Sequence, residues 1–510
     1  MQTQSRQGAA VVFRAGASVV FREGVRVEFD GDLASLTGQA SSLRLRPVRD
    51  GLRAMLTRLA AGPVPLADLL DPLPAAERAQ VASLLRRAGH LLAWCVTTGG
   101  RELARIEPTA RGADHQAADV PGDVPVRLSR FAFCRSRGNV LVLESPLAGF
   151  RAVLSHRIAR ELVAELGGAR TASDLAGDGY PLAEVTELLG HLAGAGLVEV
   201  GTPDGRFRSD EDPTLRQWDV HDLLFHSRSR PGRYDDVIGA AYPHIGQIEP
   251  LPAVKPPPDG PAVPLHRPSM DELLARDPAL TVAIEGRRSV RDYDKQPMTA
   301  EQLGEFLYRV ARVRARRVPG ADGGDEIAAR PYPSGGSAYD LELYLSVRRC
   351  AGLAEGIYYY DPVAHRLVLV NEDPAGREAM LAVASTATGL PTQPDVLITI
   401  TSRFQRVSWR YRSIAYALTL LHTGVLYQTM YLVATAIGLA PCGLGLGDAD
   451  LAARVLKLDY LRETSVGDFM LGSLPAADDG IGPPSAQWRR VNNPEWKRRA
   501  IQLLRGPLNP

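Results

Sequence analysis

The sequence predicts an α+β protein with a duplicated N-terminal part and a separate C-terminal domain. Two observations support this prediction: an internal repeat in the first two hundred residues, and mixed helical and strand patterns after a proline-rich stretch. The repeat has a constant offset of 107 residues and no gap. It matches Met55 with Leu162, Leu59 with Leu166, Val81 with Leu188, Leu85 with Leu192, and Ala88-Gly89 with Ala195-Gly196.

Both copies of the repeat show the same order of predicted elements. Alternating strands surround a turn at Glu23-Gly24 in residues 19–29, and one near Gly138-Asn139 in residues 131–145. Apolar residues at helical spacing follow, and a short apolar strand closes each copy. A β-hairpin, about three helices and a closing strand describe a winged helix. We therefore expect winged-helix modules at residues 1–105 and 125–205.

A different kind of sequence connects the repeat to the C-terminal domain. Residues 206–268 are rich in charges and turns and end in PLPAVKPPPDGPAVPLHRP, which is typical of a semi-rigid connector. The C-terminal domain is expected at residues 269–510. Helical spacing at 299–313 and strand patterns at 340–347, 356–370 and 395–404 predict a mainly antiparallel sheet packed by helices.

Composition excludes several classes of function. The chain has 510 residues, of which 45% are hydrophobic and 23% charged, and its formal net charge of +1 recruits neither nucleic acid nor an anionic membrane. The four cysteines, Cys95, Cys134, Cys350 and Cys442, form no CxxC pair, so no metal site or disulfide framework is expected. That cysteine usage and the lack of a signal peptide at the N-terminus predict a cytoplasmic protein.

One apolar segment, residues 415–440, is long enough to cross a bilayer. It carries His422, Thr423 and Gln428 near its middle, and Arg410 and Arg412 precede it. A buried helix of a soluble protein or dimer is the better interpretation, because apolarity on all faces marks burial of either kind. No membrane association is expected.

Two short motifs indicate a phosphate-bearing cofactor. The run RRSVR spans Arg287 to Arg291, and the turn PSGGS follows at Pro333 to Ser337. Arginine suits phosphate because its guanidinium stays charged and offers several donors in one plane. Taken alone, the run is more often a solvated basic stretch and the turn an ordinary turn. Their order along the chain favours a site.

The motifs together resemble those of a known enzyme family. RRSVRDYD (287–294), RPYPSGGSAYDLELYL (330–345), HDLLFHSRSR (221–230) and the long run from Arg410 to Asp448 look like the SagB-type peptide dehydrogenases. These are FMN-dependent members of the nitroreductase-like superfamily. The resemblance covers residues 215 to 475, and several motifs match in order. It implies a nitroreductase-like fold for the C-terminal domain.

The resemblance also assigns a cofactor site. In such folds the arginine run holds the FMN phosphate and the pyrimidine edge of the ring, which implies the roles of Arg287, Arg288, Ser289 and Arg291. The turn of Pro333, Ser334, Gly335, Gly336 and Ser337 approaches the ring through its backbone, usually from a partner subunit, so a homodimer is implied. Glycines allow that approach because no side chain intervenes.

A third segment of the implied FMN site is CGLGLG, residues 442–447. Backbone donors around Leu444, Gly445 and Leu446 are implied to face flavin N5 and O4, although Leu446 stands where the family has a smaller residue. The segment follows a helix, whereas a dinucleotide-binding fingerprint follows a strand and opens a helix. We therefore reject a Rossmann interpretation.

The implied reaction oxidises thiazolines or oxazolines in a modified ribosomal peptide to thiazoles or oxazoles, as in thiopeptide or linear azoline peptide biosynthesis. Relatives carry a Lys-Tyr pair where this chain has Arg410 and Tyr411. Arginine does not give up its proton, so Tyr411 is the candidate base and Arg410 its electrostatic support. A helix-capping role for both is an equal alternative, and His422 and Tyr416 are further options for the base.

The N-terminal repeat has two candidate functions. DNA binding is disfavoured because residues 76–90 carry three arginines while the matching residues 182–196 carry two glutamates and no Lys or Arg. The layout resembles modules that bind a leader peptide by adding it as a strand. The implied partners are a precursor peptide with its leader and the cyclodehydratase of the same pathway.

Two other functions stay open. One is a flavin reductase of the nitroreductase type that uses NAD(P)H on small electrophiles, and the other is a winged-helix regulator with a flavin sensor domain. The sequence does not decide between thiazoline and oxazoline, or which copy of the repeat binds a leader.

Overall fold

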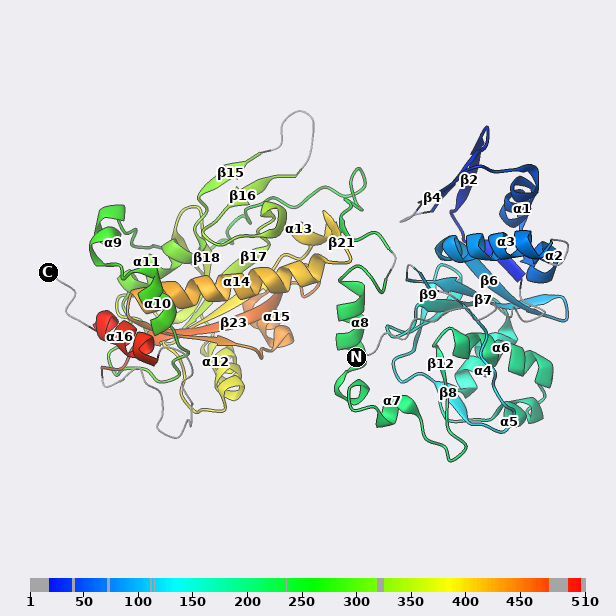
Figure 1. Ribbon diagram of the computed structural model, residues 1–510. Coiled ribbons are helices and arrows are strands. Elements are labelled where there is room, and N and C mark those ends of the chain that lie inside the picture. Colours follow the sequence, from blue (N-terminus) through cyan, green and yellow to red (C-terminus); the bar gives the residue numbers. More distant parts are fainter. Residues whose placement is uncertain are drawn as a thin grey trace. The chain divides into compact units, whose positions relative to one another are not determined.

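A computed structural model describes residues 18–38, 42–70, 74–110, 112–113, 115–234, 236–318, 325–476 and 494–505. The N-terminus, on which the expected lack of a signal peptide rests, lies outside these residues. The chain divides into two compact units, Met1–Ile238 and Gly239–Pro510. Figure 1 labels many elements of both.

The N-terminal unit is built on one seven-stranded sheet that takes strands from both copies of the repeat. Its order is β5-β1-β6-β7-β11-β10-β9. The strands are β1 (Ser18–Phe21), β5 (Val64–Pro65), β6 (Leu92–Thr98), β7 (Arg101–Pro108), β9 (Phe133–Arg137), β10 (Val140–Glu144) and β11 (Phe150–Leu154). The remaining strands form a small sheet of β2 (Arg26–Asp30), β3 (Leu33–Thr37) and β4 (Ser42–Leu45), and a pair of β8 (Val126–Leu128) and β12 (Val198–Val200).

Three helices follow the first strands of each copy, as the repeat predicts. They are α1 (Asp50–Ala61), α2 (Leu66–Leu70) and α3 (Ala75–Arg87) in the first copy, and α4 (Arg157–Glu165), α5 (Ala172–Gly177) and α6 (Leu182–Gly194) in the second. The matched residues Met55, Leu59, Leu162, Leu166 and Leu188 are buried in a single core. The repeat therefore marks shared packing positions, whereas the winged-helix name stays a prediction.

The two hairpins predicted in the repeat have different outcomes. Residues 133–144 form the expected hairpin of β9 and β10. The hairpin expected at residues 19–29 is wrong, because β1 pairs with β5 and β6 while β2 pairs with β3. In β1 three successive residues, Val19 to Phe21, are buried, so this strand belongs inside a covered sheet. Strand β2 alternates between exposed and half-buried residues.

The expected connector between the two units is partly built into the C-terminal unit. Helices α7 (Arg208–Glu211) and α8 (Val220–Arg228) lie in the N-terminal unit, but the C-terminal unit begins at Gly239, thirty residues before the predicted boundary. Within the proline-rich segment, β14 (Ala262–Pro264) pairs with β19 at the edge of the large sheet. An edge strand tolerates proline, which cannot donate a hydrogen bond to a neighbour.

The C-terminal unit is an antiparallel sheet with helices on both faces, which agrees with the α+β prediction. The strand order is β14-β19-β18-β17-β20-β23-β22, and every pairing is antiparallel. The strands are β17 (Leu341–Val347), β18 (Gly356–Asp361), β19 (Arg366–Asn371), β20 (Val396–Ser402), β22 (Leu439–Leu444) and β23 (Thr464–Ser473).

Each face of this sheet packs against its own hydrophobic core. On one face α11 (Ala300–Ala311) and the long α14 (Ala415–Ala436) cover Leu343, Ile398 and Phe469. On the other, α12 (Pro374–Thr388) and α15 (Ala449–Leu456) cover Tyr344 and Met470. Figure 1 shows α14 lying along the sheet. Among the helices that the structure describes, none is both long and apolar enough to cross a membrane.

The apolar composition of α14 suggests burial on all sides, but the structure leaves one side of the helix exposed. One side, with His422, Leu426 and Met430, faces the sheet. Another side carries exposed apolar residues at helical spacing: Tyr416, Leu420, Leu421 and Val425. An exposed apolar stripe of this kind is typical of a surface that another protein covers.

Candidate functional site

The arginine run lies in extended backbone between α10 (Leu280–Gly286) and the rest of the domain, next to strand β22. The Arg287 guanidinium lies over the Tyr431 ring at 5.0 Å from its centroid, and Ser289 Oγ is 2.7 Å from the Tyr431 hydroxyl. The backbone N–H of Val290 donates to the Pro441 carbonyl at 2.8 Å. Tyr431, on α14, therefore joins the run to the strand.

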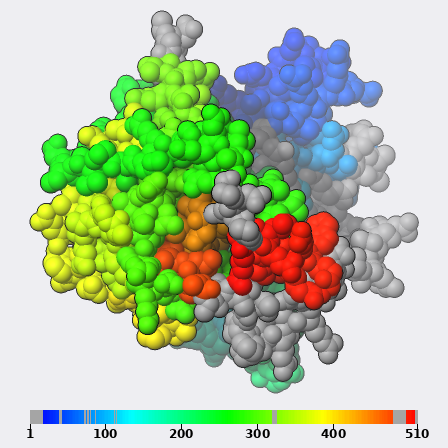
Figure 2. All heavy atoms as spheres, turned by 90° about the vertical axis from the view of Figure 1, so that its left-hand side faces the viewer, coloured from blue at the N-terminus to red at the C-terminus, as the bar shows by residue number. Residues whose placement is uncertain are grey.

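Alternate residues of the run face different surroundings. Arg287 and Ser289 face Tyr431, whereas Arg288 and Val290 line a cavity of about 200 Å³. Ile501 and Leu504 of α16 (Pro494–Arg505) close that cavity. Figure 2 shows α16 in red at the surface. The structure therefore separates Arg288 from Arg287, although the resemblance assigns both to one phosphate site.

Helix α16 is fixed to the end of α10 by one lysine. Lys497 Nζ donates to the carbonyls of Glu285 at 2.8 Å and Gly286 at 3.2 Å. A cation at this place complements the negative end of a helix dipole. The arginine run therefore begins at a fixed point of the fold.

The CGLGLG segment lies beside the run but has a different local structure from the one predicted. Cys442 to Leu444 end strand β22, and Gly445 to Gly447 form the loop that leads to α15. The segment thus does follow a strand and open a helix, contrary to the reason given for rejecting a Rossmann site. That rejection still holds, because β22 pairs antiparallel with β23 in a wholly antiparallel sheet.

Several contacts fix the end of β22. The Tyr431 hydroxyl accepts from Gly443 N–H at 2.8 Å, and the Tyr427 hydroxyl donates to the Leu444 carbonyl at 3.0 Å. Burial raises the pKa of the Cys442 thiol, while nearby Arg291 works against that rise. Leu446 is 56% exposed, so the loop presents a large apolar side chain to solvent.

A buried carboxyl group lies under this loop and was missed in the sequence. Asp468, on β23, is 5% exposed, and one of its oxygens is 2.5 Å from the place where a Gly447 Cβ would stand. Burial raises its pKa to about 6, although a hydrogen bond from Thr399 Oγ1 at 2.7 Å lowers it. The signal was a single acid inside the apolar strand SVGDFMLGS.

The PSGGS turn lies elsewhere in the unit, beside Arg410 and Tyr411. Gly336 has a left-handed φ of 58°, and a Cβ there would lie 2.6 Å from the Tyr411 hydroxyl. Arg410 Nη1 donates to the Gly336 carbonyl, and Arg410 Nη2 contacts both Asp325 oxygens at 2.6 and 2.5 Å. The turn therefore requires glycine at this position.

Arg410 is held as a cation. Partial burial by itself would lower its pKa, but the hydrogen bonds and ion pair with Asp325 raise it. Its side chain also interacts with the Tyr411 hydroxyl. Of the two further options for the base, His422 is bonded through both ring nitrogens, and Tyr416 is 42% exposed on α14. Tyr411 is therefore the candidate whose hydroxyl lies next to the turn, in contact with Arg410.

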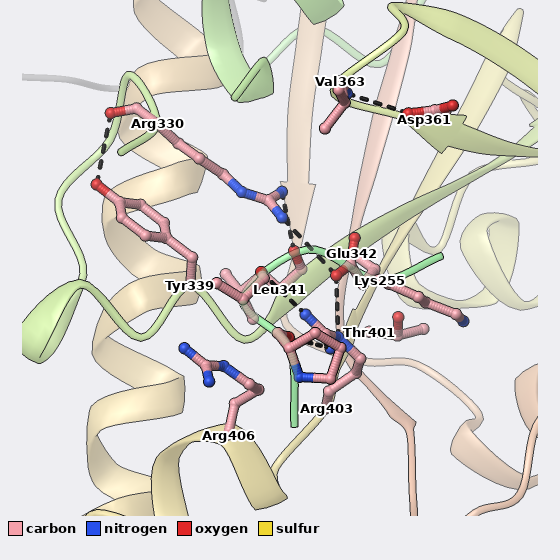
Figure 3. Close-up of polar contacts among 12 residues, drawn as sticks. Lys255, Arg330, Tyr339, Leu341, Glu342, Asp361, Val363, Thr401, Arg403 and Arg406 are labelled. Atoms are coloured by element: carbon pink, nitrogen blue, oxygen red, sulfur yellow. Dashed lines mark hydrogen bonds and ion pairs between the residues drawn. The ribbon is translucent and has the colours of Figure 1, made fainter. Parts of the chain in front are cut away.

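A network of buried arginines holds both flanks of the turn. Arg330, before the turn, donates to the Leu341 carbonyl at 3.2 Å, and Tyr339, after it, donates to the Tyr332 carbonyl at 2.8 Å. Glu342 lies between Arg330 and Arg403, as Figure 3 shows, and accepts from Arg403 Nε at 3.0 Å. The flanks cannot shift without breaking these buried contacts.

Within one chain, the predicted site residues therefore form two groups. The first contains Arg287, Ser289 and Arg291 with the CGLGLG segment, and the second contains the PSGGS turn with Arg410 and Tyr411. His422 holds the turn and Tyr431 holds the run. Tyr431 lies nine positions after His422 on α14, which is about 14 Å at about 1.5 Å per residue.

Comparison with known proteins identifies the C-terminal domain. Residues 284–473 match the model of the Nitroreductase family. A nitroreductase-family protein of the archaeon Methanocaldococcus jannaschii is 30% identical over 199 residues, which cover 39% of this chain and 92% of that protein. The chain belongs to the nitroreductase family. Residues 126–235 of this family member match a second model, Cyanobactin oxidase ThcOx.

The solved structures that match this chain have low sequence identity and TM-scores below 0.5. A nitroreductase of Ralstonia eutropha is 20% identical, with a TM-score of 0.34, and the match covers 44% of this chain and 97% of that one. The Escherichia coli microcin synthetase McbBCD complex with truncated pro-MccB17 bound gives 21% identity and a TM-score of 0.31, over 36% of this chain and 68% of the other. For a nitroreductase of Anabaena variabilis the sequence identity is 23% and the TM-score is 0.36, and the match covers 54% of this chain and 52% of that one.

The relationship predicted from the motifs is confirmed, because one chain carries both the cyanobactin oxidase region and the nitroreductase domain. The FMN prediction agrees with membership of the nitroreductase family. Nitroreductases of Desulfovibrio desulfuricans and Exiguobacterium sibiricum have been crystallised in complex with FMN. Membership of this family indicates that the protein is an oxidoreductase.

Proposed function

We propose that this protein is an FMN-dependent dehydrogenase that oxidises thiazolines or oxazolines of a ribosomally made peptide to thiazoles or oxazoles. The observation that supports this proposal best is the presence of a cyanobactin oxidase region and a nitroreductase domain in one chain. An oxidoreductase domain joined to such a region fits oxidation of a peptide better than reduction of small molecules.

The first group of site residues fits FMN. Arg287, Ser289 and Arg291 offer charged and neutral donors on the side of Tyr431 and Cys442, which suits a phosphate and the polar edge of a ring. The glycines of the loop after β22 allow a ring to approach the backbone. When bound, FMN supplies the oxidant, because it takes up a hydride.

A second copy of the chain would complete the site. The exposed stripe of α14 is centred near Leu421, next to His422, which holds the turn, and Tyr431, which holds the run, lies ten residues further along the helix. If two copies pair these helices antiparallel about a two-fold axis, the stripe is covered by itself. The position of Tyr431 in one copy then lies opposite the segment after Tyr411 in the other. The turn of one copy thereby meets the arginine run of its partner.

The chain supplies a proton acceptor at that junction. Oxidation of an azoline removes one proton and one hydride from the ring, and we assign the proton to Tyr411, whose phenolate form can accept it. Arg410 stays charged through its bond to Asp325 and supports negative charge on the neighbouring phenol. The PSGGS turn, held by Arg410 at the Gly336 carbonyl, positions the substrate ring against the tyrosine.

The N-terminal unit has an edge that suits a leader peptide. Strand β9 is the last strand of the seven-stranded sheet, and four of its five residues are exposed. An extended peptide adds to such an edge through backbone hydrogen bonds. The second copy of the repeat supplies this edge. A cyclodehydratase that prepares the azolines is the partner that this reaction requires.

One observation favours an alternative function. The archaeal relative matches only 39% of the chain, so the nitroreductase domain is shared with a protein similar to that domain alone. That domain by itself fits an NAD(P)H-dependent flavin reductase of small electrophiles. The two functions differ in whether a peptide is needed.

The deciding experiment starts with an absorbance spectrum of the purified full chain. A thiazoline peptide with its leader is then incubated with the protein in air and followed by mass spectrometry, with the leaderless peptide as control. The proposal expects a yellow protein and a loss of about 2 Da per ring. Rapid NADPH oxidation without peptide, together with an unchanged peptide mass, would establish the reductase instead.

A further inference from the structure

One buried carboxylate, Asp340, lies at the start of β17 and is 0% exposed. Its Oδ2 accepts from Ser402 Oγ at 2.6 Å and from Thr419 Oγ1 at 2.8 Å. Its Oδ1 is 2.7 Å from Nδ1 of His422. Burial by itself would raise the pKa of Asp340, but its interactions with His422, Ser402 and Thr419 outweigh burial and lower the pKa. The carboxylate is therefore ionised and can only accept.

The neighbours of His422 determine which nitrogen carries its proton. An ionised Asp340 requires a donor, so Nδ1 is protonated. On the other side, the backbone N–H of Gly335 points to Nε2 at 2.8 Å, and a backbone N–H can only donate. Nε2 therefore carries a lone pair. Both contacts select the same neutral tautomer, and neither depends on the other.

In this arrangement the basic nitrogen of His422, Nε2, is already engaged in a hydrogen bond. Ser334 Oγ lies 3.4 Å from Nε2, but that hydroxyl also accepts from the Tyr339 N–H at 3.0 Å. The lone pair is directed at Gly335, so the histidine does not take a proton from a substrate. The order of Asp340, His422 and Ser334 resembles that of a catalytic triad. The histidine, however, has no free nitrogen with which to activate the serine as a nucleophile.

The same turn is held a second time on its other side. Arg410 donates to the carbonyl of Gly336, one residue beyond the amide that His422 holds. Two successive residues, Gly335 and Gly336, are therefore fixed by side chains from α14 and from the segment before it. A glycine turn is otherwise the most freely moving kind of backbone.

We propose that Asp340 and His422 form a positioning dyad that fixes the amide of Gly335 and thereby the PSGGS turn. Asp340 sets the tautomer of His422, and His422 accepts from the turn. The role of the turn in holding substrate and cofactor rests on the function proposed above, whereas the hydrogen bonding of the dyad does not. This assigns His422 a function other than that of a base.

The test compares two substitutions of His422 that differ in hydrogen bonding. Glutamine matches both roles of the neutral tautomer, because its amide N–H₂ donates to Asp340 and its oxygen accepts from Gly335. Leucine has a similar size and fills neither role. His365 gives a matched control: it is 2% exposed in the same unit and contacts the Tyr360 hydroxyl and the His266 carbonyl, so His365→Leu removes a buried histidine away from the turn.

Hydrogen–deuterium exchange of the full chain gives the readout, on peptides that span residues 331–339. We expect His422→Leu to speed exchange of the Gly335 amide about tenfold, and His422→Gln to keep it within about threefold of the wild type. His365→Leu should leave these peptides unchanged. Wild-type protection in His422→Leu would overturn the proposal, and so would equal loss in the leucine and glutamine variants.

A second measurement separates this proposal from the proposed function. FMN content and azoline oxidation are recorded for the same variants, and both should fall in His422→Leu and be retained in His422→Gln. If the wild type binds no FMN, the proposed function fails while the exchange result still tests the dyad. If His422→Leu oxidises azolines at the wild-type rate, the positioning role fails while the proposed function stands.

Discussion

Removal of one guanidinium tests the FMN site most directly. Arg287 and Arg288 are adjacent in sequence, but only Arg287 lies on the side of Tyr431, whereas Arg288 lines the cavity closed by α16. A hydrogen bond between a guanidinium and a phosphate is worth about 1.5–3 kcal/mol. Arg287→Ala should therefore raise the Kd for FMN about 10- to 150-fold. Arg288→Ala should raise it less than about threefold.

The assay is a titration of flavin-free protein with FMN, followed by the quenching of flavin fluorescence. Thermal unfolding of each variant without FMN shows whether either substitution damages the fold itself. An equal loss of affinity in the two variants would refute the assignment of the two sides, and a larger loss in Arg288→Ala would reverse it. Retention of stoichiometric FMN by Arg287→Ala through purification would contradict the phosphate site as a whole.

Three further predictions concern the base, the dimer and the N-terminal core. Tyr411→Phe should keep FMN but slow azoline oxidation at least about 100-fold, and an unchanged rate would remove Tyr411 as the base. Leu421→Arg places a charge on the exposed stripe of α14, so light scattering should show monomers that have lost FMN; a dimer that keeps FMN would contradict the shared site. Burial and the neighbouring His191 lower the pKa of His115 to about 3. The neutral imidazole therefore stabilises the folded protein fully above the ordinary histidine pKa, and this stabilisation is lost as the pH falls below about 6.5. Urea unfolding should show about 2 kcal/mol of this loss between pH 7.5 and pH 5, and His115→Phe should remove it; an identical acid dependence in both proteins would count against the assignment.

Local patterns predicted the elements of the C-terminal unit well, because each carries its own signal. The apolar segment from residue 415 became α14, and the strand pattern at 340–347 became β17. The hairpin expected at residues 19–29 failed because pairing depends on which distant strand offers the better partner. Strand β1 pairs instead with β6, which lies more than seventy residues away.

The candidate site was predicted as a set of residues but not as an arrangement. The motifs named the run, the turn and Tyr411, yet they could not show that Arg288 turns away from Arg287. Asp468 was overlooked because an acid within a strand gives no sign of what will lie above it. The contacts of His422 depend on Asp340, which lies 82 residues away and whose burial follows only from the packed sheet.

The buried arginines also determine where the catalytic unit can be cut from the rest of the chain. Arg403 donates to the carbonyl of Pro252 at 2.9 Å, Arg406 to that of Leu251 at 2.5 Å, and Trp409 to that of Ile248 at 2.6 Å. A fragment that began at residue 269 would leave these donors without their acceptors, at a cost of about 1–3 kcal/mol for each. A fragment that begins at Gly239 keeps all three and also keeps β13 (Gly239–Ala240), which pairs with the strand that carries Tyr411. The natural unit of FMN chemistry in this protein therefore includes the segment that its sequence presents as a connector.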